Sequence, residues 1–233
     1  MPGDDVELIA LPLGGEDGPD VRLLDLIRLP NLEATAARFL TGPEQAEYAE
    51  LRHPLRRREW LGVRVCLKLM VRRRGLVGGP LDCAVIKDPR GRPRLVAAPG
   101  LTADVVVDCS LSHKGRFACA AISSAAGRRI GVDVEEISPR LRTLRDQFTH
   151  PRDRLLDSHP EGERLTILWA LKEACSKVGG RGLAMGLREI ACQETAPGHH
   201  RVSTGEVELA GRHAMLDGYV VALCVGASGA LEG

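Results

Sequence analysis

Three acidic side chains stand at spacings that suit a divalent cation. Asp133 and Glu135 alternate with valines in the segment RIGVDVE at 129–135, so a strand there points both carboxylates to one face. Glu173 and Lys177 lie four residues apart in WALKEACSK at 169–177, where apolar spacing predicts a helix that presents both on one side. Because Mg²⁺ binds a few carboxylates together with substrate oxygens and water, the pattern predicts a magnesium site that holds a phosphate or pyrophosphate.

Both segments also fit an ordinary structural interpretation. An acid that alternates with valine is typical of any half-solvated strand. A glutamate four residues before a lysine stabilises an exposed helix by about 0.2–0.5 kcal/mol without any further function. From these residues alone, both interpretations remain open.

The composition is that of a globular chain without a strong global charge. The chain has 233 residues, 44% of them hydrophobic, enough for one large domain or two small ones. Its net charge of +1, from 32 basic and 31 acidic residues, argues against nucleic acid or an anionic membrane as principal partner. Arginine clusters at 56–58 and 72–74 provide local positive charge that suits a compact phosphate-rich ligand.

The cysteines and the N-terminal segment indicate the compartment. The seven cysteines are scattered among apolar residues without a Cys-x-x-Cys spacing, which argues against zinc and for buried thiols in a reducing compartment. The first residues, MPGDD, have no secretory signal pattern, and no apolar run reaches membrane-spanning length. We therefore expect a cytoplasmic protein.

The order of predicted elements indicates a duplication. Apolar periodicity predicts helices near 23–39, 44–52, 54–74, 141–156 and 161–178, and strands near 6–13, 84–87, 93–96, 105–110, 117–123, 129–135, 189–194, 206–210 and 219–225. Aligning Trp60 with Trp169 also matches Cys66 to Cys175 and Lys68 to Lys177. We expect two α+β lobes, residues 1–126 and 127–233, with a cleft between them. The alternative is that both helices use tryptophan and cysteine as core filler.

Several separate blocks together resemble the 4'-phosphopantetheinyl transferases. The blocks are GVDVE at 131–135, WALKEACSK at 169–177, the Ser112-His113 pair within SLSHKGRF at 110–117, GRP at 91–93, REWLG at 58–62 and GRGL at 180–183. The chain looks like the larger, single-chain (surfactin-type) branch, which activates peptide and polyketide synthases. The resemblance spans about 39–183 and implies a pseudo-twofold α+β fold with the active site in the cleft.

The resemblance also implies a reaction and a role for each residue. The family transfers the 4'-phosphopantetheine arm of coenzyme A to a serine of an apo carrier protein and releases adenosine 3',5'-bisphosphate. Asp133, Glu135 and Glu173 would hold Mg²⁺, with Mn²⁺ as the alternative ion. Glu173 would act as the general base, with Lys177 and Lys172 supplying positive charge. The residues implied for coenzyme A are Arg58, Arg92, Ser112, His113, Lys114, Asp133 and Lys177.

One departure and two other functions stay open. The family often has lysines where this chain reads EQAEY at 44–48, so we expect arginines 56–58 or Lys114 to compensate. The helix at 141–148 either faces an acidic carrier protein or packs its leucines inward. The other functions are a metal-dependent hydrolase of nucleotide pyrophosphates and a non-catalytic module that binds carrier proteins. We expect the transferase to be a monomer, with the two lobes as a pseudo-dimer.

Overall fold

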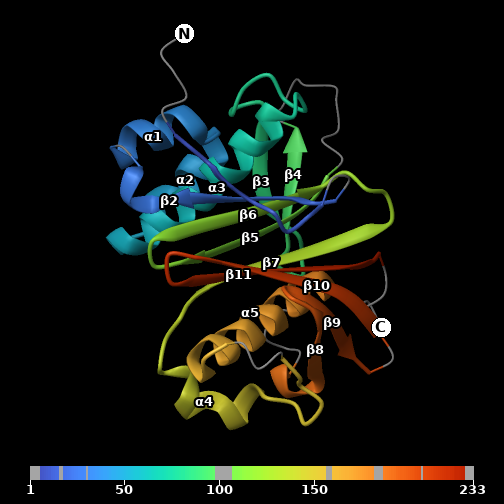
Figure 1. Ribbon diagram of the computed structural model, residues 1–233. Helices are drawn as coiled ribbons and strands as arrows, with labels where there is room; N and C mark the ends of the chain where they lie inside the picture. The colour runs from blue at the N-terminus through green and yellow to red at the C-terminus, as the bar shows by residue number, and fades with distance from the viewer. Residues whose placement is uncertain are drawn as a thin grey trace.

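The computed structural model describes residues 6–15, 18–29, 31–97, 107–155, 159–180, 186–205 and 207–228. It forms four layers, with helices, two facing β-sheets and helices again (Figure 1). The first sheet has the strand order β1-β2-β6-β5 and the second the order β7-β11-β10-β9-β8, both antiparallel throughout. None of the helices in the described ranges is long and apolar enough to cross a membrane.

The N-terminal half supplies the first sheet and its helices. Its elements are β1 (Ile9–Leu11), β2 (Asp20–Asp25), α1 (Leu32–Phe39), α2 (Gly42–Glu50), α3 (Pro54–Arg73), β3 (Cys83–Lys87), β4 (Pro93–Ala97), β5 (Asp108–Lys114) and β6 (Phe117–Ser123). Strands β3 and β4 form a separate hairpin.

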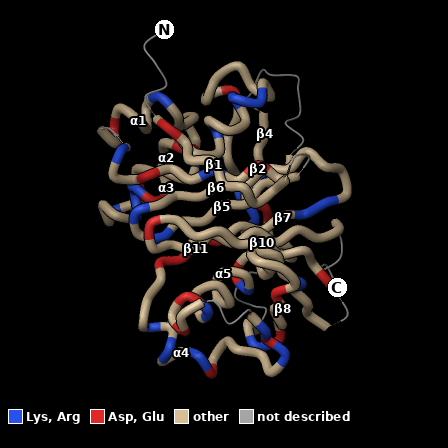
Figure 2. Tube along the Cα trace, viewed as in Figure 1, with Lys and Arg blue, Asp and Glu red and all other residues tan. Residues whose placement is uncertain are grey.

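The C-terminal half supplies the second sheet and its helices. Its elements are β7 (Arg128–Glu136), α4 (Leu141–Phe148), α5 (Glu161–Gly179), β8 (Ile190–Ala196), β9 (His199–Thr204), β10 (Val207–Leu216) and β11 (Tyr219–Ala227). Charged residues of both signs occur in both halves (Figure 2).

Strand β6 is packed against apolar residues on both of its faces, as its sequence requires. All seven of its residues, FACAAIS, are buried. Phe117, Cys119 and Ala121 pack into the apolar core between the two sheets. Their alternate neighbours Ala118, Ala120 and Ile122 pack into the core beneath helix α3. A strand that is apolar at six of its seven positions and buried on both faces therefore fits the middle of a layered stack.

The two halves repeat one topology, which confirms the predicted α+β fold with two similar lobes. Apart from the additional strand β1, in each half a first strand, β2 or β7, leads through helices to a hairpin and then to two final strands. The first strand pairs with the last one, β2 with β6 and β7 with β11, and the last pairs with the one before it. The chain passes from the first sheet to the second between Ser123 and Arg128.

A buried lysine occurs at the same place in both halves. Lys68 of α3 donates to the carbonyl at the end of α1, Phe39, and to Glu44. Lys172 of α5 donates to the carbonyl at the end of α4, Phe148, and to Asp153. Each acid also accepts a strand amide, from Val85 in the first half and Cys192 in the second.

These contacts correct the predicted register of the duplication. The tryptophan alignment matched Lys68 to Lys177, whereas the shared hydrogen-bond partners match it to Lys172. The prediction of a helix from residue 23 is also wrong, because residues 20–25 form strand β2 and α1 begins only at Leu32. The helix expected over 141–156 ends at Phe148.

The two sheets meet where β5 lies along β7, and side chains join them there. The backbone N–H groups of β7 residues 130, 132 and 134 donate to side chains two residues apart on β5, namely Asp108, Ser110 and Ser112. The distances are 2.7, 2.9 and 3.3 Å. We call this series the side-chain ladder. It gives the backbone N–H groups of the edge strand β7 hydrogen-bond acceptors without backbone pairing between β5 and β7.

We expect Ser110→Ala to weaken this junction. The change leaves the buried N–H of Val132 without its acceptor, which costs about 1–3 kcal/mol in the free energy of unfolding. Chemical denaturation measures the effect, with Ser124→Ala as control because Ser124 is exposed. Equal stability of the two variants would show that the ladder contributes nothing at this position.

Candidate active site at the junction of the two sheets

Asp133 lies at the centre of the junction between β5, β7 and α5. Its Oδ1 atom accepts hydrogen bonds from Ser112 Oγ at 2.8 Å and from Lys177 Nζ at 2.7 Å. The residue is 5% exposed, and its Oδ2 atom is buried without a hydrogen-bond partner. A buried carboxylate oxygen without a partner is costly unless a further group binds there.

Gly131 explains why α5 can lie so close to this strand. A Cβ atom at this position would stand 2.0 Å from the carbonyl oxygen of Ala174 on α5. Only glycine therefore permits the approach. Ile130, Val132 and Val134 point the other way, into the core between the sheets. As a result, the alternate residues of β7 face α5, and the approach brings Glu173 and Lys177 to Asp133.

Glu173 has an electrostatic environment that favours its protonated form. Burial raises its pKa to about 7, assisted by the negative charges of Asp133 and Glu135 and opposed by the positive charge of Lys177. A carboxylate whose pKa lies near neutrality can both accept and hold a proton under ordinary conditions.

Glu135 lies at the outer end of the acidic group that it forms with Asp133 and Glu173. Burial raises its pKa, and the charge of Asp133 adds to the rise. Lys114 Nζ lies 2.7 Å from its Oε2 atom, and the Trp169 side chain donates a hydrogen bond to it, both of which oppose the rise. Burial first, and the neighbouring negative charges second, thus raise the pKa values of both Glu135 and Glu173.

The chemistry of these three carboxylates fits a hard divalent cation. They offer oxygen donors of the kind that Mg²⁺ prefers, including the unpartnered Oδ2 of Asp133. Their ligand atoms do not, however, all lie within 4.8 Å of one another. Among the described residues, one group of three acidic, histidine or cysteine side chains meets that limit, and it consists of Glu194, His200 and His213. Shared binding of an ion by Asp133, Glu135 and Glu173 therefore remains a prediction.

His113 extends the site toward helix α3. Its Nε2 atom lies 3.1 Å from Arg56 Nη1, and its Nδ1 atom lies 3.4 Å from Glu59 Oε1. Burial lowers its pKa, and Glu59 opposes the change. The sequence pattern singled out Arg58 in this helix as a phosphate contact and indicated Arg56 only as part of the run 56–58. The arginine run at 56–58 contained both, but only the path of the helix past β5 decides which one meets the histidine.

Three of the predicted site residues lie elsewhere. Lys172 is fully buried on another side of α5, where its amine contacts Asp153 and the carbonyls of Phe148 and Ile190. Arg58 donates to the carbonyl of Leu26. The structure thus brings together Ser112, His113, Lys114, Asp133, Glu135, Glu173 and Lys177, but not Lys172, Arg58 or Arg92.

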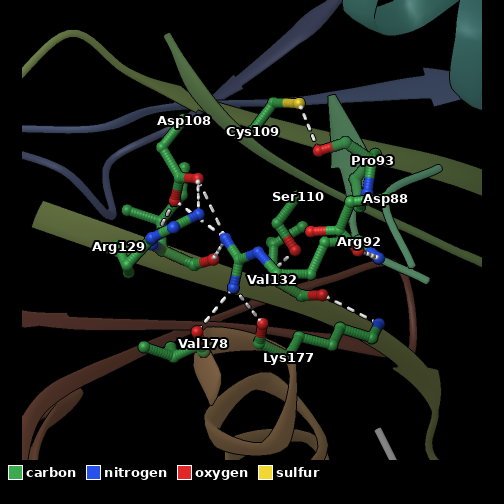
Figure 3. A network of polar contacts seen from close by, with 11 residues as sticks. Asp88, Arg92, Pro93, Asp108, Cys109, Ser110, Arg129, Val132, Lys177 and Val178 are labelled. Atoms are coloured by element: carbon green, nitrogen blue, oxygen red, sulfur yellow. Dashed lines mark hydrogen bonds and ion pairs between the residues drawn. The ribbon is translucent and has the colours of Figure 1, made fainter. Parts of the chain in front are cut away.

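Arg92 holds the end of α5 rather than facing a phosphate site (Figure 3). Its guanidinium donates to both carboxylate oxygens of Asp108, at 2.9 and 3.0 Å, and to the carbonyls of Lys177 and Val178. The side chain is almost fully buried. Because a cation at a helix C-terminus is favourable, Arg92 fixes the backbone from which Lys177 projects.

Two hollows flank the acidic group of Asp133, Glu135 and Glu173. One, of about 320 Å³, is lined by residues that include Lys114, Glu135 and Trp169. The other, of about 140 Å³, is lined in part by Ser110 and Lys177. The larger hollow is at the lower end of the usual range of about 300–1,000 Å³ for ligand sites and the smaller one is below it, so a nucleotide-sized substrate would have to extend over the surface from the junction.

Comparison with known proteins points to one superfamily. Residues 129–224 match the family model described as the 4'-phosphopantetheinyl transferase superfamily. A 4'-phosphopantetheinyl transferase of Bacillus subtilis is 27% identical over 113 residues, which are 47% of this chain and 46% of that protein. A putative 4'-phosphopantetheinyl transferase of Synechocystis is 25% identical over 167 residues, 67% of this chain and 63% of that protein. The matches thus span about half to two thirds of these relatives.

Two solved structures are also similar. The holo-[acyl-carrier-protein] synthase of Thermotoga maritima is 27% identical, with 57% of this chain and 75% of that chain covered and a TM-score of 0.37. The enzyme of Helicobacter pylori, solved in complex with coenzyme A, is 20% identical, with 42% and 99% covered and a TM-score of 0.36.

Proposed function

We propose, from the match of residues 129–224 to the 4'-phosphopantetheinyl transferase superfamily, that the chain transfers 4'-phosphopantetheine from coenzyme A to a serine of an apo carrier protein. The other product is adenosine 3',5'-bisphosphate. One observation carries the proposal for the site. Asp133 has one buried, unpartnered oxygen, Oδ2, and its other oxygen, Oδ1, accepts from the amine of Lys177. Its charge also helps burial to raise the pKa of Glu173 to about 7. Within the superfamily, we assign the chain to the larger single-chain branch, which acts as a monomer on peptide and polyketide synthase carriers.

Asp133, Glu135 and Glu173 are the residues we propose to hold Mg²⁺, with Mn²⁺ as the alternative ion. The bound ion would neutralise the pyrophosphate of coenzyme A and polarise the phosphorus under attack. The acidic group also has positive side chains at its edges. Lys177 contacts Asp133 at one edge and Lys114 contacts Glu135 at the other. A polyanionic substrate would thus meet both the ion's ligands and two amines.

Glu173 is the proposed general base. A serine hydroxyl is a weak nucleophile until a positioned carboxylate accepts its proton, and a base works best when its pKa lies near the working pH. The carboxylate of Glu173 would take the proton as the serine oxygen bonds to the β-phosphorus and the bond to the bridging oxygen breaks, releasing the bisphosphate. Lys177 would stabilise the charge that develops on the pyrophosphate.

We propose that His113, with Arg56 beside it, contacts a phosphate of coenzyme A, and that Lys114 contributes charge nearby. Ser112 serves the site indirectly, because its hydroxyl donates to Asp133 and accepts from the N–H of Val134. It thereby orients the Asp133 carboxylate. Arg92 and Lys172 have no part in this proposal. For the location we propose the cytoplasm, where the seven buried thiols would remain reduced.

The transfer assay tests the proposal directly. The protein is incubated with coenzyme A, Mg²⁺ and apo carrier domains, and the mass of each carrier is measured. We expect the carrier to gain one phosphopantetheine group. Release of bisphosphate without a carrier would instead identify a pyrophosphate hydrolase. An unchanged carrier that still binds the protein would identify a non-catalytic module.

We expect removal of divalent ions to abolish transfer. EDTA in excess should stop the mass gain, because three clustered carboxylates would then face the pyrophosphate with little opposing charge. Added Mg²⁺ should restore the rate, and Mn²⁺ should do so in part. Undiminished transfer in EDTA would contradict the assignment of these carboxylates as ion ligands.

A further inference from the structure

A second polar group lies within the C-terminal sheet, on strands β8, β9 and β10. On β8, Glu194 pairs directly with His200 of β9, and His200 in turn pairs with Gly211 of β10. His213 lies two residues beyond Gly211, so it projects from the same face. The register of three strands therefore gathers one carboxylate and two imidazoles on one face.

Gly211 makes room for this arrangement. A Cβ atom there would stand 3.2 Å from the Cβ of His200 and 3.2 Å from a methyl group of Leu171 on α5. The face is thus the one covered by α5, and His200 is buried beneath the helix at 4% exposure. Glu194 and His213 are only half-buried, which leaves the group open to solvent on one side.

The distances suit a metal site. One ligand atom from each of Glu194, His200 and His213 lies within 4.8 Å of the other two. His200 Nε2 lies 2.7 Å from His213 Nδ1. The other ring nitrogen of His200, Nδ1, is buried without a hydrogen-bond partner. A buried imidazole nitrogen without a partner is unusual in native proteins, so His200 has an unused ligand atom besides the one that meets His213.

We infer that Glu194, His200 and His213 form a binding site for a zinc-class divalent ion, separate from the carboxylates of the junction. Two imidazoles and one carboxylate are the donors that Zn²⁺ takes in three-ligand sites, with water in the fourth position. Such an ion ties together three neighbouring strands. His159, which precedes α5, lies alongside with its ring 5.7 Å from that of His213, and its Nδ1 is 3.3 Å from Glu163 Oε2.

The charge of the group is compatible with such an ion. Burial lowers the pKa of His200 to about 4 and also lowers the pKa of His213. Both rings are thus neutral near pH 7, which is the form that ligates metals. The cysteine spacing that argued against zinc has no bearing on these ligands, because they come from histidines and a glutamate brought together by the sheet.

Zinc binding to the whole protein tests the inference. The chain is treated with EDTA, dialysed into a buffer with excess Mg²⁺ to occupy the junction carboxylates, and titrated with ZnSO₄ by calorimetry. We expect one Zn²⁺ per chain and a higher melting temperature with zinc. Glu194→Gln and His213→Gln should each weaken binding by about tenfold or more, in line with changes around known zinc sites. Co²⁺ in place of zinc should give the visible absorption of a site with nitrogen ligands.

His199→Gln is the matched control. His199 precedes His200 on the same strand, is exposed and projects from the opposite face. This variant should bind zinc as the wild type does. Absence of stoichiometric binding by the wild type would overturn the inference, as would wild-type affinity in both Glu194→Gln and His213→Gln. Because the readout is metal binding, the result does not depend on the transferase activity.

Discussion

Glu173→Gln is expected to reduce the rate of phosphopantetheine transfer by about 10²–10⁴, the usual contribution of a positioned general base. Glutamine keeps the size of the side chain but accepts no proton. Its amide is neutral, so the change also lowers the negative charge of a site where burial and the charge of Asp133 already raise the pKa values of Glu135 and Glu173. We therefore expect the fold to persist and only the chemistry to fail.

The measurement is the single-turnover rate of carrier modification at saturating Mg²⁺ and coenzyme A. Glu163→Gln is the matched control, because Glu163 lies on the same helix and contacts His159 rather than Asp133. It should transfer at the wild-type rate. Near-native turnover by Glu173→Gln would remove Glu173 from the role of base and with it the mechanism proposed for the junction.

Lys172→Met is expected to lower the free energy of unfolding by about 3–5 kcal/mol, the range found when one partner of a buried ion pair is removed. The change leaves the carboxylate of Asp153 buried without its cation and the carbonyls of Phe148 and Ile190 without their donor. These groups connect α4, the loop that follows it and β8 to α5. The C-terminal lobe should therefore loosen as a unit.

Denaturant unfolding measures the loss, and Lys68→Met should give a loss of similar size because Lys68 makes the equivalent contacts in the other lobe. The exposed Lys87 supplies the control, Lys87→Met, which should be neutral. Transfer by Lys172→Met, measured where the variant is folded, should remain near the wild-type rate. A transfer rate reduced a hundredfold in the folded variant would instead restore the catalytic role first expected for Lys172.

The sequence sufficed to single out Asp133, Glu135 and Glu173 as an acidic group. It did not suffice to predict the contacts that these side chains make. The alternation around Asp133 and the four-residue spacing of Glu173 and Lys177 are local patterns, and local patterns fix which residues share a face. Their meeting required Gly131, whose contact with Ala174 lies across more than forty residues of chain. The resemblance to a known family supplied that long-range information.

Other predictions failed where distant partners decide the outcome. Residues 20–25 form a strand because they pair with β6, almost a hundred residues later, and this pairing overrides their local appearance as part of a helix. Lys172 stands next to Glu173 in sequence, yet successive residues of a helix point about 100° apart, so the two serve different neighbours. Arg92 likewise meets the end of α5 only through the folded arrangement of both lobes.

The duplicated topology carries the acidic group in only one of two corresponding pairs of strands. In the second lobe Asp133 faces Ala222 of the partner strand β11. In the first lobe Leu24 faces Ala118 of β6, the corresponding pair of strands, and Leu24 is buried in the apolar core under α3. A leucine can neither bind a cation nor hold a lysine. The corresponding position of the first lobe therefore cannot repeat the acidic group, and that lobe serves the junction through β5 instead, where Ser112 orients Asp133.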